Sequence, residues 1–295
     1  MGTTCITSSA LQDLAGDALI CPICYSNKTK KAFSLQFRAT SGPISTDIYV
    51  CGNCRVYWRV FTDTPPLDAH FEITSYTDIQ YEPAYKTERT GFFKQIIDIA
   101  KERASLFSDE TSKPTLMDFG CSYGHLMDVA STDGFHCIGV ELADHLRQRL
   151  ASQYEMHKNT DSIPDNSANI ITCIDSLYYC EDVYLQMEQF HRILKKDGLL
   201  LLRICNRNYF IKLLQVFGRT ITPKLFGDQL FALNHKSIKI ITGAVGFKIE
   251  GIVYKEIKPK KQGILLQVGY GVLPFICRLT GLKLTPGLLY ILRKK

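Results

Sequence analysis

The sequence predicts an α/β protein in which helices cover both faces of a mostly parallel sheet, with a small N-terminal module attached. Two observations predict this fold. From residue 115 onward, short apolar runs alternate with helical patterns, as they do in successive βαβ units. The 295 residues are 45% hydrophobic and 22% charged, so the chain is long and apolar enough for a large core plus an accessory domain.

Three regions differ in composition. Residues 1–70 contain five cysteines, four of them in two pairs, with alternating stretches at 46–50 and 55–61 that predict short strands. Residues 71–112 begin with spaced tyrosines and continue with apolar residues at helical spacing, which predicts a linker followed by an amphipathic helix. Residues 113–295 carry the alternating pattern and are expected to form the main domain.

The elements of the main domain follow from the lengths of its apolar runs. Strands are expected at 115–119, 136–140, 170–174 and 199–204, and helices at 125–131, 144–154 and 183–194. A closing apolar run at 288–292 predicts a final strand that lies antiparallel to its neighbours.

Two CxxC pairs stand near the N-terminus. Cys21 and Cys24 form the first pair, and Cys51 and Cys54 form the second, with 26 residues between the two pairs. Each pair can wrap a tight turn that directs two thiolates at one ion, and two such turns complete the tetrahedral sulfur shell that zinc prefers. The spacing therefore predicts one structural zinc ion per chain, with no open coordination position for chemistry.

Three other interpretations of these cysteines fit the sequence less well. Two disulfides are disfavoured because eleven cysteines are too few for a disulfide scaffold and no secretory leader pattern is present, so reduced thiols in the cytoplasm are expected. A redox CxxC is disfavoured because neither pair lies between a strand and a helix of a βαβ unit. Unrelated core cysteines would not show such regular spacing.

A glycine-containing turn follows the first strand of the main domain. Gly120 and Gly124 let the backbone approach a ligand, and Glu141 ends the next strand, where a carboxylate can accept both hydroxyls of a ribose. A dinucleotide fingerprint would have glycine where Ser122 stands. Asp118 precedes the turn and would repel a pyrophosphate but attract an ammonium group. These residues favour S-adenosylmethionine, which carries an amine and a sulfonium, over a dinucleotide.

The runs DFGCSYGHL at 118–126 and GVE at 139–141, with the stretch 162–204, resemble a class I S-adenosylmethionine-dependent methyltransferase. SIKIITGAVGF at 237–247 resembles the helix and strand that usually continue this fold. With the two cysteine pairs, the pattern is most similar to zinc-ribbon methyltransferases of sugar and polysaccharide biosynthesis. The resemblance implies a Rossmann-like, doubly wound sheet of seven strands.

The resemblance also implies a set of cofactor-binding residues. It assigns the methionine end to the turn from Asp118 to Gly124, the ribose to Glu141, the adenine to the loop after the next strand, and the closing of the pocket to the end of the fourth strand. The residues so assigned are Asp118, Gly120, Cys121, Gly124, Glu141, Thr160, Asp161, Ile174 and Asp175. The Cys121 thiol is itself expected to pack as a small apolar group.

The sequence departs from this family after the fourth strand, where many relatives have Glu-His and this chain has Tyr178 and Tyr179. A histidine there would be a natural proton acceptor, whereas a tyrosine with a pKa near 10 is a poor base at neutral pH. Tyr179 is the best-placed candidate for a catalytic residue. The alternative role for Tyr179 is a pocket wall that packs against cofactor or substrate.

The acceptor is expected to be a small molecule or a carbohydrate, including a lipid-linked one. The zinc module is expected to serve as a lid or acceptor platform, with Tyr76, Tyr81 and Tyr85 over the mouth of the pocket. Disrupting one of the two cysteine pairs, as in Cys51→Ser, is then expected to unfold the module locally and to leave cofactor binding largely intact. Two other functions stay open: an RNA methyltransferase whose zinc module and net charge of +6 grip nucleic acid, and a non-catalytic cofactor-binding protein.

A basic cluster at 258–261 stands directly before an uncharged stretch at 262–277 that is too short and too polar to span a bilayer. Such a pairing can lie on an anionic membrane, which would suit a lipid-linked acceptor. The favoured interpretation of this stretch is a core helix and strand before the last strand of the sheet.

Overall fold

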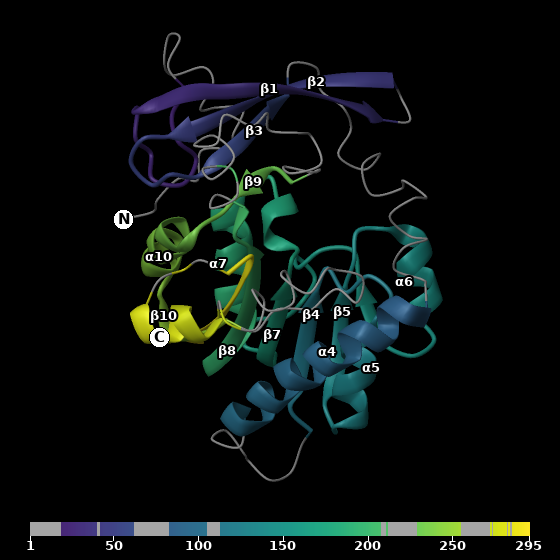
Figure 1. The fold of residues 1–295 in the computed structure, drawn as a ribbon. Helices are drawn as coiled ribbons and strands as arrows, with labels where there is room; N and C mark the ends of the chain where they lie inside the picture. Colours follow the sequence, from purple (N-terminus) through teal and green to yellow (C-terminus); the bar gives the residue numbers. More distant parts are fainter. Residues whose placement is uncertain are drawn as a thin grey trace.

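A computed structural model of the chain contains two β-sheets, one above the other in Figure 1. The structure describes residues 19–39, 42–61, 83–104, 113–207, 211, 229–254, 272, 274–281, 283 and 285–295. Among these residues, no helix has both the length and the apolar composition needed to cross a membrane.

The larger sheet has seven strands in the order β10-β11-β8-β7-β4-β5-β6. β11 runs antiparallel to both of its neighbours, and the pairings from β8 to β6 are parallel. The strands are β4 (Thr115–Phe119), β5 (His136–Val140), β6 (Glu155–His157), β7 (Ala168–Ile174), β8 (Leu194–Cys205), β10 (Phe247–Val253) and β11 (Gly287–Lys294). The predicted fold class and the antiparallel final strand are confirmed.

Helices cover both faces of this sheet. α4 (Pro83–Ala104) and α5 (His125–Thr132) pack on one face, and α7 (Val183–Ile193) and α10 (His235–Val245) pack on the other. Two shorter elements, α6 (Asp144–Leu150) and the 3-10 helix η2 (Leu177–Tyr179), follow β5 and β7.

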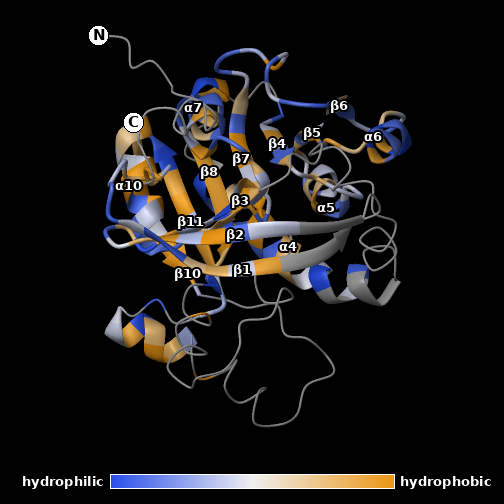
Figure 2. Cartoon of the chain, turned by 90° about the horizontal axis from the view of Figure 1, so that it is seen from above, coloured by the Kyte–Doolittle hydropathy of each residue, from blue (hydrophilic) through white to orange (hydrophobic). Residues whose placement is uncertain are grey.

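The middle of the β8 strand is a run of four leucines, Leu199 to Leu202. Leu199 and Leu201 lie in the core formed with α4 and α5, whereas Leu200 and Leu202 lie in the core formed with α7. Because successive side chains point to opposite faces, a strand that is covered on both sides favours a continuous apolar run over alternation. Figure 2 shows this as hydrophobic residues concentrated on β7, β8 and β11.

The smaller sheet is antiparallel and joins distant parts of the sequence. It consists of β1 (Thr29–Ala39), β2 (Gly42–Cys51), β3 (Tyr57–Phe61) and β9 (Phe231–Ala232), in that order. β9 comes from the main domain, so the N-terminal strands are joined to that domain by backbone pairing.

Several elements differ from expectation. β1, β6 and β9 were not predicted from the sequence, and α6 ends at Leu150 because the chain turns into β6. α4 is the amphipathic helix expected after the linker, and its residues Phe92, Phe93 and Ile96 pack into the core of the larger sheet. Tyr76 and Tyr81 lie outside the described residues, and Tyr85 lies in the first turn of α4. The domain boundaries stay a prediction.

Candidate functional site

The order of the strands in the larger sheet reverses at β4. From β4 the chain proceeds through β5 and β6 on one side, and through β7 and β8 on the other. Ligands of open α/β sheets bind outside the carboxyl ends of the strands at such a reversal point. The predicted glycine turn follows β4, and Glu141 and Asp175 follow β5 and β7, so these three segments meet at this reversal point.

The glycine turn is fastened to the end of β5. The backbone N–H groups of Gly120 and Cys121 both donate to the carbonyl of Val140, at 2.8 and 3.2 Å. Gly120 adopts a φ of 73°, and a Cβ there would overlap the side chain of Ser176. Only glycine therefore allows the turn after β4 to pack directly against the segment after β7.

Glu141 is half-buried, and both of its carboxylate oxygens are fixed by backbone donors. Ser122 N donates to Oε2 at 2.9 Å, and Ala143 N donates to Oε1 at 3.1 Å. Each carboxylate oxygen keeps a further lone pair, so the group can still accept hydroxyl donors from a ligand. Ser122 has a φ of 50°, which explains why glycine is favourable at this position.

Asp118 lies buried beneath the turn. Thr172 Oγ1 donates to its Oδ1 at 2.7 Å. Burial, with a smaller contribution from the Glu141 carboxylate, raises the pKa of Asp118 to about 7 despite the Thr172 hydrogen bond. A carboxyl with such a pKa gains most from a nearby cation, because a cation offsets the cost of burying the charge.

The other residues predicted to bind the cofactor differ in burial and in their contacts. Cys121 is buried, and burial raises the pKa of its thiol. Thr160 is also buried, and its carbonyl accepts a 2.9 Å hydrogen bond from Arg192 of α7. Asp161 is exposed on the loop after β6, whereas Ile174 is half-buried at the end of β7. The structure thus holds Thr160 through α7 and leaves Asp161 accessible.

A charged pair at the end of β7 and β8 was missed by the sequence analysis. Arg203 is buried on β8 and forms an ion pair with Asp175, and its guanidinium lies 5.5 Å from the ring centre of Phe92. Asp175 has a φ of 58° and donates its N–H to the Arg203 carbonyl at 3.1 Å. A Cβ on Gly287 would overlap the guanidinium, so this glycine makes room for Arg203.

The two tyrosines after β7 differ in burial. Tyr178 is only 3% exposed, and burial raises its pKa well above the ordinary value, which excludes it as a base at neutral pH. Tyr179 is half-buried on η2, and its ring centre lies 4.9 Å from that of Tyr178. Tyr179 lies four residues after Asp175, at the edge of the sheet where the parallel strands have their carboxyl ends. This is the position expected from the sequence.

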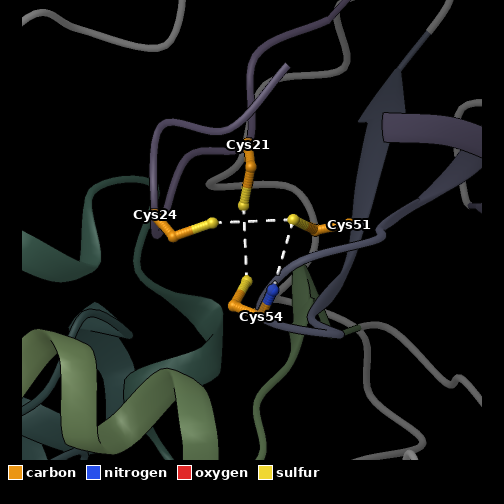
Figure 3. A group of neighbouring side chains, drawn as sticks. All are labelled: Cys21, Cys24, Cys51 and Cys54. Carbon is orange, nitrogen blue, oxygen red and sulfur yellow. Dashed lines mark hydrogen bonds between the residues drawn. The ribbon is translucent and has the colours of Figure 1, made fainter. Parts of the chain in front are cut away.

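The four cysteines of the N-terminal module converge on one point (Figure 3). Their Sγ atoms all lie within 4.8 Å of one another, with Cys21 to Cys54 at 3.5 Å and Cys24 to Cys51 at 3.6 Å. A tetrahedral zinc site with Zn–S bonds of about 2.3 Å has sulfur-to-sulfur separations of about 3.8 Å. The donor set therefore fits zinc, and these separations are too long for the disulfide alternative.

The cysteine turns also contact the main domain. Tyr184 of α7 donates its hydroxyl to the carbonyl of Ile23, inside the first pair, at 2.5 Å. At the start of α10, Asn234 donates to the carbonyl of Cys54 at 3.1 Å, and Lys236 donates to that of Asn53 at 2.6 Å. Each turn is thereby held against a different helix of the larger domain.

Part of the chain matches a known protein family. A family model described as a methyltransferase domain matches residues 92–243. No curated protein sequence matches the chain closely enough to count as a relative.

Solved structures resemble the fold at low sequence identity. A putative S-adenosylmethionine-dependent methyltransferase from Listeria monocytogenes is 14% identical with a TM-score of 0.47, covering 66% of this chain and 96% of its own. One from Mesorhizobium loti is 17% identical with a TM-score of 0.46, covering 65% and 96%. Magnesium protoporphyrin IX methyltransferase from Synechocystis, with bound SAH, is 14% identical with a TM-score of 0.49, covering 78% and 98%. At these identities the likeness concerns the fold alone.

Proposed function

The chain belongs to the family of methyltransferase domains, and from this premise we propose that it transfers a methyl group from S-adenosylmethionine to a small-molecule or carbohydrate-type acceptor. When bound, this cofactor supplies an electrophilic methyl group on a sulfonium. The chain's own task is to hold the acceptor in line with that methyl group and to exclude water.

The hydrogen-bonding groups at the reversal point of the sheet support our assignment of the cofactor site. We assign the ammonium group of the cofactor to Asp118, its methionine backbone to the turn at Gly120 and Gly124, and its ribose to Glu141. Two features carry this assignment: a buried carboxyl beneath the turn, and a carboxylate fixed by two backbone donors at the end of the neighbouring strand.

Replacing Glu141 with alanine is expected to weaken binding of S-adenosylhomocysteine by about 1.5 to 3 kcal/mol, the usual cost of losing charge-assisted hydrogen bonds. The substitution also removes the acceptor for Ser122 N and Ala143 N. Titration calorimetry would measure the change, with Glu155→Ala on the exposed face of β6 as a control. Equal affinity of Glu141→Ala and the parent protein would contradict the ribose assignment.

Cofactor affinity is expected to depend on pH through Asp118. Below about pH 7 this carboxyl is protonated in the free protein, so binding a cation beside it must first release a proton. Affinity should then fall by up to about tenfold for each pH unit below 7 and stay constant above it. Calorimetry in buffers of different ionisation enthalpy would detect the proton release, and Asp118→Asn should abolish both effects.

The same raised pKa affects the free protein in the opposite direction. Between the ordinary value of 3.8 and about 7, the folded state keeps a proton on Asp118 that the unfolded state has lost. The contribution of Asp118 to the free energy of unfolding therefore decreases as pH rises through this window. As pH rises through this window, cofactor affinity should increase while the free energy of unfolding decreases. This combination would identify Asp118 as the titrating group.

We also propose that Cys21, Cys24, Cys51 and Cys54 bind one zinc ion. The support is the convergence of four sulfur atoms from two tight turns, at separations close to those of a tetrahedral shell. Four protein ligands close that shell, so the ion would stabilise the module and would perform no chemistry.

The attachment of the small sheet to the edge of the large one supports its proposed role as an acceptor platform. Leu230, directly before β9, donates its N–H to the carbonyl of Tyr178 and accepts from the N–H of Arg59, at 3.0 and 2.8 Å. This one residue connects β3 to η2. We propose that the small sheet thereby positions Tyr179, which contacts the acceptor either as a proton acceptor or as a wall of its pocket.

The burial of three residues on β3 disfavours the nucleic-acid alternative. In the sequence, Arg55, Tyr57, Trp58 and Arg59 form the small basic and aromatic set on which an RNA-binding module would rely. Tyr57, Trp58 and Arg59 are 4, 6 and 7% exposed, so these three cannot stack on bases or contact phosphates.

A methyl-transfer screen with labelled cofactor would test the proposed function. Sugar nucleotides, lipid-linked sugars and RNA would be offered separately, and label is expected in a sugar-containing acceptor. Label in RNA alone would overturn the proposal in favour of the nucleic-acid alternative. Tight cofactor binding without transfer to any class would favour a non-catalytic binding protein.

A further inference from the structure

A short helical segment near the C-terminus exposes an apolar stripe. The segment comprises the described residues 272 and 274–280, and it is the yellow helix of Figure 1. Its exposed apolar side chains are Val272 (48%), Phe275 (61%), Ile276 (39%) and Leu279 (72%). These positions are spaced i, i+3, i+4 and i+7, so the four side chains share one helix face.

A core helix buries its apolar face, whereas this segment exposes it. A core helix and strand was the favoured expectation for 258–277, of which 258–271 lie outside the described residues. In the described part, Cys277 is fully buried while the four larger apolar side chains face outward. Figure 2 shows the segment at the edge of the molecule, so the expectation of a core helix is wrong for these residues.

The segment is connected to the carboxyl edge that holds the proposed cofactor site. Asn206, directly after β8, donates to the carbonyls of Lys283 and Thr285 at 2.7 and 3.2 Å. β11 then begins at Gly287, which pairs with Cys205 at the end of β8. The seven residues from 281 to 287 reach at most about 24 Å, so whatever the stripe binds lies close to this edge.

The charge of the surrounding sequence indicates the chemistry of the partner. Between 255 and 283 there are six basic residues and one acidic residue, namely Lys255, Lys258, Lys260, Lys261, Arg278 and Lys283 against Glu256. Arg278 is exposed on the segment itself. An apolar helix face within a basic sequence matches an anionic lipid surface, which attracts lysine and arginine and accepts apolar side chains at the acyl boundary.

We propose that the stripe formed by Val272, Phe275, Ile276 and Leu279 docks the protein on an anionic phospholipid surface. A second copy of the chain fits less well, because two such basic sequences would repel each other. Four side chains are also far fewer than the 20 to 30 or so residues a side of a stable protein interface. Docking at this point would bring the carboxyl edge near the bilayer, which, if the proposed function is correct, suits a lipid-linked acceptor.

Vesicle flotation tests this proposal without any measurement of methyl transfer. The full chain would be mixed with vesicles of phosphatidylcholine and phosphatidylglycerol, and with vesicles of phosphatidylcholine alone. Binding is expected only to the mixed vesicles, and it should weaken as salt concentration rises. The double variant Phe275→Ser/Leu279→Ser should lose about tenfold to hundredfold in vesicle affinity, because two exposed apolar side chains are removed.

A matched control is Leu185→Ser on α7, which removes another exposed leucine, 48% exposed, outside the stripe. This control should bind mixed vesicles as the parent protein does, and both variants should keep the parent melting temperature. Failure of the parent protein to bind mixed vesicles, or equal binding by the double variant, would overturn the proposal. So would a parent dimer in light scattering that the double variant converts to a monomer, since the stripe would then bind a second copy.

Discussion

Replacing Cys51 with serine is expected to release the metal and to lower the melting temperature by at least about 10 °C. Structural zinc contributes roughly 10 to 16 kcal/mol in small zinc-dependent folds, which is comparable to the whole stability of a typical domain. Cys51 is fully buried in a core that also contains Trp58 of β3 and Phe231 of β9. Loss of the ion should therefore also destabilise elements outside the N-terminal strands.

This expectation revises the one from sequence, in which the damage stayed local. The turns of the cysteine pairs are held by Tyr184, Asn234 and Lys236, so their unfolding also removes contacts from α7 and α10. Metal analysis and scanning calorimetry would check the result. Cys137→Ser, at a buried cysteine in the other core, should keep one zinc per chain. A Cys51→Ser protein that retained its metal and melted like the parent would contradict the zinc assignment.

The second large effect is expected at Arg203. Changing it to methionine leaves the Asp175 carboxylate without its cation in a largely buried position, which should cost about 3 kcal/mol. This is the lower end for a buried pair, because the Asp175 side chain is still 19% exposed. The melting temperature should fall by roughly 6 to 12 °C, and binding of S-adenosylhomocysteine should weaken because Asp175 borders the proposed pocket.

Arg293→Met is the matched control for this change. Arg293 on β11 forms a comparably buried ion pair with Glu250, 2.5 Å long, and it also donates to the carbonyl of Asp197, in β8 close to its amino end. Glu250 also pairs with Arg103 at 3.3 Å and keeps that cation, so Arg293→Met should lose somewhat less stability than Arg203→Met and keep its cofactor affinity. Gly287→Ala, which crowds the Arg203 guanidinium without removing it, should reproduce part of the loss of affinity. If Arg203→Met and Arg293→Met bound cofactor equally well, the pair would be structural only.

The strands of the main domain and the glycine turn were predictable because their signals are local. Apolar runs of five residues produced β4 and β5 with the expected bounds. The alternation of Phe33, Leu35 and Phe37 could also have predicted β1, which was missed. β9 was not predictable, because two residues become a strand only by pairing with β3, more than 170 positions away.

The candidate site was predictable in its glycines and carboxylates and not in its ion pair. Asp118, Gly120 and Glu141 are recognisable by their places at the ends of strands. Arg203 was missed although a lone arginine inside an apolar strand is a signal, since a buried charge requires a partner. That partner, Asp175, lies 28 positions earlier in the sequence, and only the parallel register of β7 and β8 brings the two together.

Calorimetric titration of the parent protein with S-adenosylhomocysteine and, separately, with NAD tests the central claim most directly. The buried Asp118, the Gly120 turn and the Glu141 carboxylate favour a nucleoside with an ammonium group over one with a pyrophosphate. S-adenosylhomocysteine is therefore expected to bind at one site per chain with a micromolar Kd, about 8 kcal/mol, and NAD is expected to give no binding heat. Tight binding of NAD with no binding of S-adenosylhomocysteine would contradict the account.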